Sequence, residues 1–331
     1  MDALSKKQGA IQLEDCECIG LSVREVVNGE STAKDLDIVF HHAGMPDAII
    51  KDCDATLNKG VKLCSQMNNI DIPVIEDIGH VMATALKHQF EGKSRYKEFI
   101  AKTSQGANYL RQTDLAFLIP PKLRSKGRFQ SIGKLAKWGS KMLDVFAVKG
   151  RAEKGSVLER LRKTFPGFNT LKPFIKNFAC TAKITADVME ILKNQGLDKA
   201  SHDRCLQLAQ ELPVRSKVKK RLLKWLKEHL KIQQKITNLP LLVSSDILES
   251  LFGNFKHVMQ RSPQADMNRT TLLIPALCGN REEDTVIQAF KLASQKDLMA
   301  WEQKEIPYTL QKKRQAFFAE NEIQKPGIIV Y

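Results

Sequence analysis

Two acidic residues and a lysine have a spacing that could carry out chemistry on a phosphodiester. Glu249 lies in the segment SSDILESLFGNFK, residues 244–256, and Lys256 follows it seven residues later. Seven residues are about two helical turns, so both side chains would lie on nearly the same helical face. A carboxylate can hold a divalent metal ion, and a lysine beside it can contact a phosphate as a point charge. Alternatively, Glu249 is only a solvated residue on the flank of an amphipathic helix.

Two aspartates follow short apolar stretches that have the length of buried strands. Asp52 comes directly after the predicted strand 48–51, and Asp77 ends the predicted strand 72–77. Parallel strands place ligands at their carboxyl ends, so both carboxylates are site candidates, and His80 could face the same edge from the first turn of the next helix. Alternatively, both aspartates only cap the helices that follow them. Asp54 could instead cap the helix after Asp52, which would leave Asp52 free.

Strands and helices alternate at the start of the chain and then give way to helices. Apolar β-branched runs predict strand structure within residues 10–27, and helices are expected over 31–43 and 55–68. This alternation is typical of an α/β fold with parallel strand pairing. Residues 78–236 show only helical patterns, and further helices are expected over 282–303 and 308–320. We expect one arc of the helix around Glu249 to pack on the sheet; it contains Ile247, Leu248, Leu251, Phe252, Phe255, Val258 and Met259.

The composition points to a polyanionic partner. The chain has 331 residues, a formal net charge of +15 and a pI of about 9.4, which is typical of proteins that bind nucleic acid. The sequence contains no run of 18 apolar residues, so we expect no membrane partner. The seven cysteines are scattered and do not form a disulfide framework, which favours a reducing cytoplasm.

Two basic stretches could contact a nucleic-acid backbone. Residues 115–143 contain no acid, and residues 214–235 contain nine basic residues and one acid. Runs of charge are usually solvated helix faces, but aromatic residues are interleaved here, which favours phosphate binding with stacking. The candidate DNA contacts are Lys122, Arg124, Lys126, Arg128, Lys134, Trp138, Lys217, Lys219, Lys220 and Arg221.

Four segments, in order, resemble DDE-type transposases of insertion sequences. They are GMPDAIIKDCDATLNKGVKL, EDIGHVMATALK, QTDLAFLIPPKLRSKGRFQSIGKLAKW and SSDILESLFGNFK. The first resembles the second-aspartate segment of the family, and the last resembles its final catalytic helix. The second resembles an Asp/Cys-x-x-His segment, with Asp77 in the place that a cysteine can take. The resemblance covers most of residues 10–280.

The resemblance implies a ribonuclease-H-like mixed sheet with flanking helices, interrupted by a large all-α insertion. Residues 1–77 would form the α/β part, 78–236 the basic helical insertion, 237–280 the part with the catalytic helix, and 281–331 C-terminal helices. The family's first catalytic aspartate belongs on a first strand that would lie before Met1. We therefore expect an N-terminally truncated copy.

The resemblance also implies DNA binding followed by metal-dependent strand cleavage and strand transfer, impaired here by loss of the first aspartate. Asp52 and Glu249 would be catalytic and hold Mg²⁺ or Mn²⁺, with Asp77, His80 and Lys256 in supporting roles. The partners would be transposon ends and target DNA, a homodimer is possible, and no small-molecule substrate is expected. The protein would lie in the bacterial cytoplasm, associated with the nucleoid. The alternatives are a non-catalytic DNA-binding transposase remnant and a helical RNA-binding protein.

Overall fold

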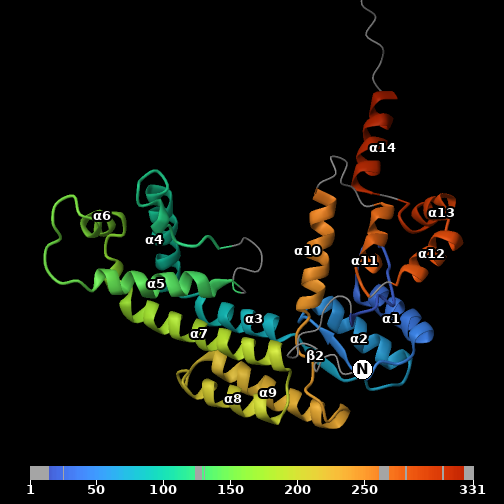
Figure 1. Ribbon diagram of the computed structural model, residues 1–331, viewed down its shortest axis with the longest axis horizontal. Helices are drawn as coiled ribbons and strands as arrows, with labels where there is room; N and C mark the ends of the chain where they lie inside the picture. Colours follow the sequence, from blue (N-terminus) through green and yellow to red (C-terminus); the bar gives the residue numbers. More distant parts are fainter. Residues whose placement is uncertain are drawn as a thin grey trace, which may run out of the picture.

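The protein is mostly helical. The computed structural model describes residues 15–24, 26–123, 129, 131–260, 268–279, 282–307 and 309–323. In this part of the chain, helices account for 69% of the residues and strands for 3% (Figure 1). The expected ribonuclease-H-like mixed sheet is therefore wrong. Among the described residues the sheet has two strands, and side chains of the helix at 217–236 take the place of a third strand along one edge.

The sheet consists of two short strands at the centre of the described chain. Strand β1 (Ile49–Lys51) pairs in parallel with β2 (Val74–Glu76), so that Ile50 lies opposite Ile75. The predicted strands 48–51 and 72–77 are thus confirmed, and α2 (Ala55–Met67) forms the crossover between them.

The strand structure expected within residues 10–27 is absent from residues 15–24, 26 and 27, whereas residues 10–14 and 25 lie outside the described ranges. This segment is held by side chains instead of a strand ladder. Ser22 Oγ and Arg24 Nε donate to the Asp35 carboxylate on α1 (Gly29–Ala43) at 3.0 and 2.8 Å. Its apolar residues Val26 and Val27 are exposed, so no sheet face recruits them.

Helices α1 and α2 form a small layer with its own core. Phe40 and Cys64 are buried between them, and the predicted helices 31–43 and 55–68 are confirmed. A Cβ atom at Gly60 would lie 2.5 Å from the Thr32 side chain, so this close crossing requires glycine. Asp54 caps α2 by accepting from the N–H of Thr56 at 2.7 Å.

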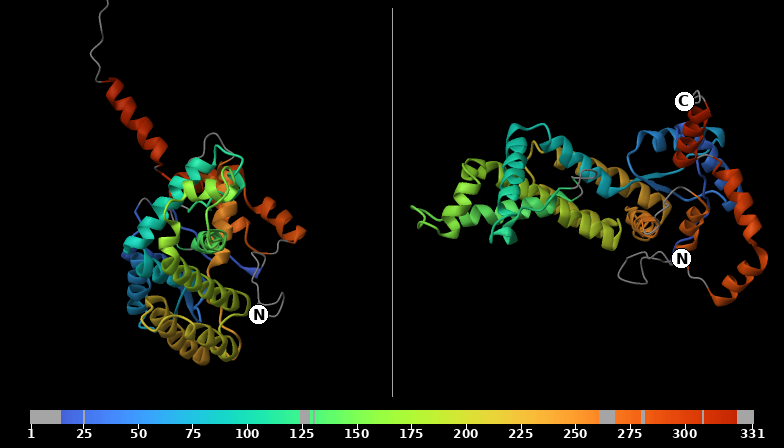
Figure 2. Two further views of the ribbon diagram at one scale, coloured as in Figure 1. Left: turned by 90° about the vertical axis from the view of Figure 1, so that its left-hand side faces the viewer. Right: turned by 90° about the horizontal axis from the view of Figure 1, so that it is seen from above.

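The helical block between residues 78 and 236 holds most of the hydrophobic core. Its helices are α3 (Ile78–Phe90), α4 (Ser94–Leu110), η2 (Ala116–Leu118), α5 (Ile132–Phe146), α6 (Val157–Thr164), η3 (Phe168–Leu171), α7 (Lys172–Gln195), α8 (Lys199–Gln210) and α9 (Lys217–Ile236). The rings of Phe90, Phe99 and Phe178 are buried against one another. The block extends away from the sheet along the long axis of the molecule, as Figure 1 and the right-hand view of Figure 2 show.

The C-terminal helices begin with α10 above the sheet and continue with α11 to α14 on the side away from this block (Figure 1). They are α10 (Asp246–Gln260), η4 (Arg269–Leu272), α11 (Leu273–Ala276), α12 (Glu283–Leu292), α13 (Gln295–Glu305) and α14 (Leu310–Ile323). The single helix expected over 282–303 is two helices, because Ser294 caps α13 through the N–H of Asp297. The loop residues 261–267 lie outside the described ranges.

Helix α10 does not pack on the sheet as expected. Of its apolar arc only Leu251 is buried, whereas Leu248 and Phe252 are 48% and 45% exposed. The physical reason is the size of the sheet, since two strands of three residues offer no broad face to cover. The helix instead approaches the sheet edge with its N-terminal end and rises away from it (Figure 1).

The aromatic core should dominate the stability of the helical block. Phe178 is fully buried, so Phe178→Ala removes a ring from a close-packed site and should lower the free energy of unfolding by about 3–5 kcal/mol. Phe117 is 76% exposed, and Phe117→Ala should change it by less than about 0.5 kcal/mol. Urea unfolding of both variants measures the difference. Equal effects would contradict this assignment of the core.

Candidate functional site

Asp77 occupies the junction between β2 and α3. Its side chain is 2% exposed, and it accepts hydrogen bonds from the backbone N–H of His80 at 2.8 Å and from the His80 ring at 3.1 Å. It also accepts from the backbone N–H and the hydroxyl of Ser245 at 2.6 and 2.9 Å. The capping role of Asp77 is therefore confirmed, and the same carboxylate fixes the chain segment that leads into α10.

These contacts set the protonation of both partners. Burial tends to raise the pKa of Asp77, but hydrogen bonds from His80 and Ser245 outweigh it and hold this pKa well below its usual range. The hydrogen bond to Asp77 raises the pKa of His80, which burial opposes. The pair therefore favours a carboxylate beside a protonated imidazole.

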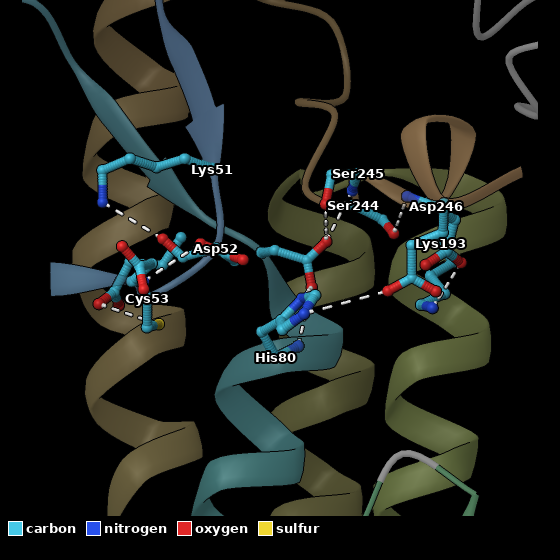
Figure 3. A network of polar contacts seen from close by, with 12 residues as sticks. Lys51, Asp52, Cys53, His80, Lys193, Ser244, Ser245 and Asp246 are labelled. Atoms are coloured by element: carbon cyan, nitrogen blue, oxygen red, sulfur yellow. Dashed lines mark hydrogen bonds and ion pairs between the residues drawn. The ribbon is translucent and has the colours of Figure 1, made fainter. Parts of the chain in front are cut away.

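Two further carboxylates act on the same histidine. The Nε2 atom of His80 lies 4.0 Å from Oε1 of Glu249 on α10. The charges of Asp52 and Glu249 add to the rise in the pKa of His80, behind the larger effect of Asp77. Asp52 stands just past the end of β1, where its Oδ1 accepts from the N–H of Asp54 at 3.1 Å (Figure 3). The structure thus brings Asp77 and Glu249 to within 4.0 Å of His80, and Asp52 lies near enough for its charge to act on the same ring. We call these four residues the acid–histidine cluster.

The members of this cluster differ in their access to solvent. The side chain of Asp77 is enclosed, whereas those of His80 and Glu249 are 34% and 57% exposed. An incoming ligand would therefore meet His80 and Glu249 while Asp77 stays behind them. Lys256 is exposed about two turns further along α10, roughly 10 Å from Glu249 along the helix axis.

The cluster supplies few protein ligands for a metal ion. Among the described residues, no group of three or more His, Cys, Asp or Glu side chains is arranged to hold one. Mg²⁺ is usually held by one or two carboxylates together with waters and substrate phosphates, so a site of this kind does not need a closed protein cage. Asp52 and Glu249 fit that donor set.

Sequence reasoning missed two contacts that frame the site. Lys193 of α7 forms an ion pair with Asp246 at the N-terminal end of α10 (Figure 3). Arg221 of α9 forms a 2.7 Å ion pair with Glu76, the last residue of β2. Both pairs join residues far apart in the sequence, so no local pattern could have revealed them.

The basic candidates from the first stretch have different surroundings. Lys122 and Lys134 are exposed, whereas Arg124, Lys126 and Arg128 lie outside the described residues. The ring of Trp138 packs edge-on against Phe165 and Phe168, and its N–H donates to the Leu118 carbonyl at 3.0 Å. The contacts of Trp138 are therefore those of a packing residue.

The second stretch presents an ordered row of charge on α9. Lys219 donates to the carbonyls of Gln210 and Leu212 at 3.3 Å, so it and Arg221 are engaged within the protein. The exposed lysines recur every three or four residues and so lie on one side of the helix for about 27 Å. This lysine stripe consists of Lys217, Lys220, Lys224, Lys227, Lys231 and Lys235.

Comparisons with known proteins identify no relative. No protein-family model matches the sequence, and no curated protein matches it. In the described part of the chain, no helix has both the length and the apolar character needed to cross a membrane.

The buried carboxylate of Asp77 should make the free energy of unfolding depend on pH in the acid range. The folded pKa of Asp77 lies below its unfolded value of about 3.9, so its stabilisation is present above that pH and is lost as pH falls towards the folded pKa. Asp77→Asn places an amide against the Ser245 donors and should lower the free energy of unfolding at pH 7 by about 2–4 kcal/mol. Denaturant unfolding between pH 7 and pH 2 measures this.

Asp47 provides the matched control, because it is an exposed aspartate close to β1. Asp47→Asn should change the free energy of unfolding by less than about 0.5 kcal/mol at every pH. The difference between wild type and Asp77→Asn should shrink in acid. A difference that stays constant from pH 7 to pH 2 would contradict the ionised, hydrogen-bonded state of Asp77.

Proposed function

We propose that this protein is a DDE-type insertion-sequence transposase that binds DNA and whose acid–histidine cluster supports metal-dependent strand cleavage and strand transfer, both impaired because only two of the family's three metal-holding acids are identified in it. The observation that carries the proposal is the 4.0 Å approach of Glu249 to His80, from a distant part of the sequence, at the end of the sheet where Asp52 follows β1. These are the two residues that the sequence singled out as metal-holding acids. The described residues do not form the ribonuclease-H-like sheet of that family, so the proposal rests on the residues of the cluster and on the basic surface, and it locates the protein at the nucleoid in the cytoplasm.

The chemistry divides between the exposed and the enclosed members of the cluster. Asp52 and Glu249 would hold Mg²⁺ or Mn²⁺, which supplies stabilisation of charge on the reacting oxygens of a phosphodiester. Protonated His80 donates a hydrogen bond to a non-bridging phosphate oxygen, and Asp77 keeps it charged and oriented. Lys256 contacts a phosphate further along α10.

The lysine stripe provides the contact with the DNA backbone. Six exposed lysines over about 27 Å match about eight base pairs at 3.4 Å per pair. Among the described residues, the ion pair of a stripe lysine is that of Lys224 with Glu228 at 3.7 Å. An exposed pair of this kind is weak, so it leaves the lysine available to a phosphate. The stripe supplies affinity without reading base sequence.

Cleavage should depend on Asp52 and Glu249. In a nicking assay on supercoiled DNA that carries matching transposon ends, we expect Mg²⁺- or Mn²⁺-dependent nicking that falls at least about 100-fold in Asp52→Asn and in Glu249→Gln, because each loses a charged ligand. Glu211→Gln, at an exposed glutamate after α8, is the control and should leave the rate unchanged. Wild-type rates in Glu249→Gln would refute the assignment.

A second candidate function is a non-catalytic DNA-binding protein that competes with an active transposase. The observation that favours it is the lack of a three-ligand metal group among the described residues, alongside an intact lysine stripe. A chain that binds DNA but shows neither Mn²⁺ binding nor nicking would establish this function and exclude the first.

DNA affinity should depend on the stripe and on salt. Each lysine that neutralises a phosphate contributes about 0.9 to the slope of log affinity against log salt. The double variant Lys220→Ala, Lys227→Ala should therefore reduce that slope by about 2 while leaving the fold intact. Gln234→Ala, an exposed neutral position on the same helix, is the control. Fluorescence anisotropy with a labelled duplex at several salt concentrations measures the slope for the double variant and for the control. An unchanged slope in the double variant would show that DNA binds elsewhere.

A further inference from the structure

The second edge of β2 is completed by a helix. One edge of β2 pairs with β1, and an unpaired strand edge normally leaves N–H and C=O groups without partners. Here the carbonyl of Glu76 accepts from the indole N–H of Trp225 at 3.0 Å. The backbone N–H of Glu76 donates to Nε2 of His229 at 3.0 Å. Two side chains of α9 therefore form the hydrogen bonds with the Glu76 backbone that a neighbouring strand would otherwise form.

The imidazole of His229 is held in the form that this contact needs. Its Nδ1–H donates to the carbonyl of Trp225 at 2.9 Å, which leaves Nε2 unprotonated and able to accept. The ring is 3% exposed and stacks on Trp225 with ring centroids 4.3 Å apart. Burial lowers the pKa of His229, so the ring stays neutral near pH 7.

The contacts with β2 and the lysine stripe occupy different sides of α9. Arg221, Trp225 and His229 follow one another at intervals of four residues and so form one row along the helix. This row faces β2, and Arg221 reaches the Glu76 side chain. At about 100° per residue, the row lies about a third of a turn around the helix from the lysine stripe. The same helix thus meets solvent with one side and the strand end with the other.

We propose that Trp225 and His229 are positioning residues for the acid–histidine cluster. They hold the peptide of Glu76 from α9, and this fixes the path along which the next residue, Asp77, enters the site and orients His80. Because α9 also carries the lysine stripe, the two residues set DNA bound on that stripe in a fixed relation to the cluster. The consequence for cleavage rests on the proposed function, whereas the positioning itself does not.

A hydrogen-exchange experiment on the full chain tests the positioning. The readout is the exchange rate of the His80 backbone N–H. This group donates to Asp77 and is protected from exchange only while that carboxylate is in place. Trp225→Phe keeps an aromatic ring and removes the donor to Glu76 together with part of the buried ring volume. We expect exchange of the His80 amide to rise at least tenfold in Trp225→Phe and in His229→Leu. His229→Gln keeps an acceptor for the Glu76 N–H and should stay within threefold of wild type.

Two controls separate positioning from general loss of stability. Phe178→Leu destabilises the same core away from β2, and its His80 exchange should stay within threefold of wild type under native conditions. Gln234→Ala changes an exposed residue of α9 and should have no effect. The proposal is overturned if His229→Leu or Trp225→Phe leaves His80 exchange within threefold of wild type, or if Phe178→Leu raises it as much.

The cleavage assay tests the functional consequence separately. Trp225→Phe should lower kcat about tenfold and leave DNA affinity within twofold, because misplacing the acids costs rate while the stripe is untouched. A kcat within twofold of wild type would overturn the functional consequence. A wild-type chain that does not cleave DNA would overturn the proposed function, whereas the exchange rates decide the positioning by themselves.

Discussion

The carboxylate of Asp77 is buried at the point where β2 ends and α3 begins, and the site depends on the hydrogen bonds it accepts. A buried charge is costly unless donors surround it, and here His80 and Ser245 supply them. Because Ser245 leads into α10, the same carboxylate anchors that helix against α3. Glu249, one turn into α10, is thereby brought to 4.0 Å from His80. A single enclosed acid thus brings the exposed Glu249 to His80.

The small sheet is stable in this setting because helices complete it. Strand β2 has a strand on one edge and α9 on the other, where Trp225 and His229 satisfy the N–H and C=O of Glu76. Arg221 adds a charged contact to the Glu76 side chain. The helical block is therefore more than an appendage that carries positive charge. It forms one wall of the site, and its outer side bears the lysine stripe.

Local patterns in the sequence were enough for the strand–helix–strand unit around Asp52 and Asp77. Apolar runs bounded by turn residues marked β1 and β2, and their parallel pairing agrees with the helix that connects them. The size of the sheet could not be predicted, because strand pairing depends on distant partners, and the contacts of α9 with Glu76 replace them.

Whether Asp77 was a cap or a ligand also stayed open in the sequence, since the Ser245 donors come from 168 residues away. That Asp52 and Glu249 belong to one site stays a prediction, in which the 4.0 Å approach of Glu249 to His80 is the part that the structure describes. Composition could not tell whether Trp138 packs inside the protein or stacks on DNA bases. Its contact with Phe165 depends on the fold and cannot be read from a basic stretch of sequence.

The central claim is that Asp52 and Glu249 form one metal-binding edge beside His80. Paramagnetic broadening by Mn²⁺ in the NMR spectrum of the ¹⁵N-labelled chain tests it most directly, because the effect falls steeply with distance from the ion. We expect substoichiometric Mn²⁺ to broaden the amide signals of Asp52, His80 and Glu249 before all others, and Glu249→Gln to remove this selectivity. Broadening that begins elsewhere, or that is unchanged in Glu249→Gln, would contradict the claim.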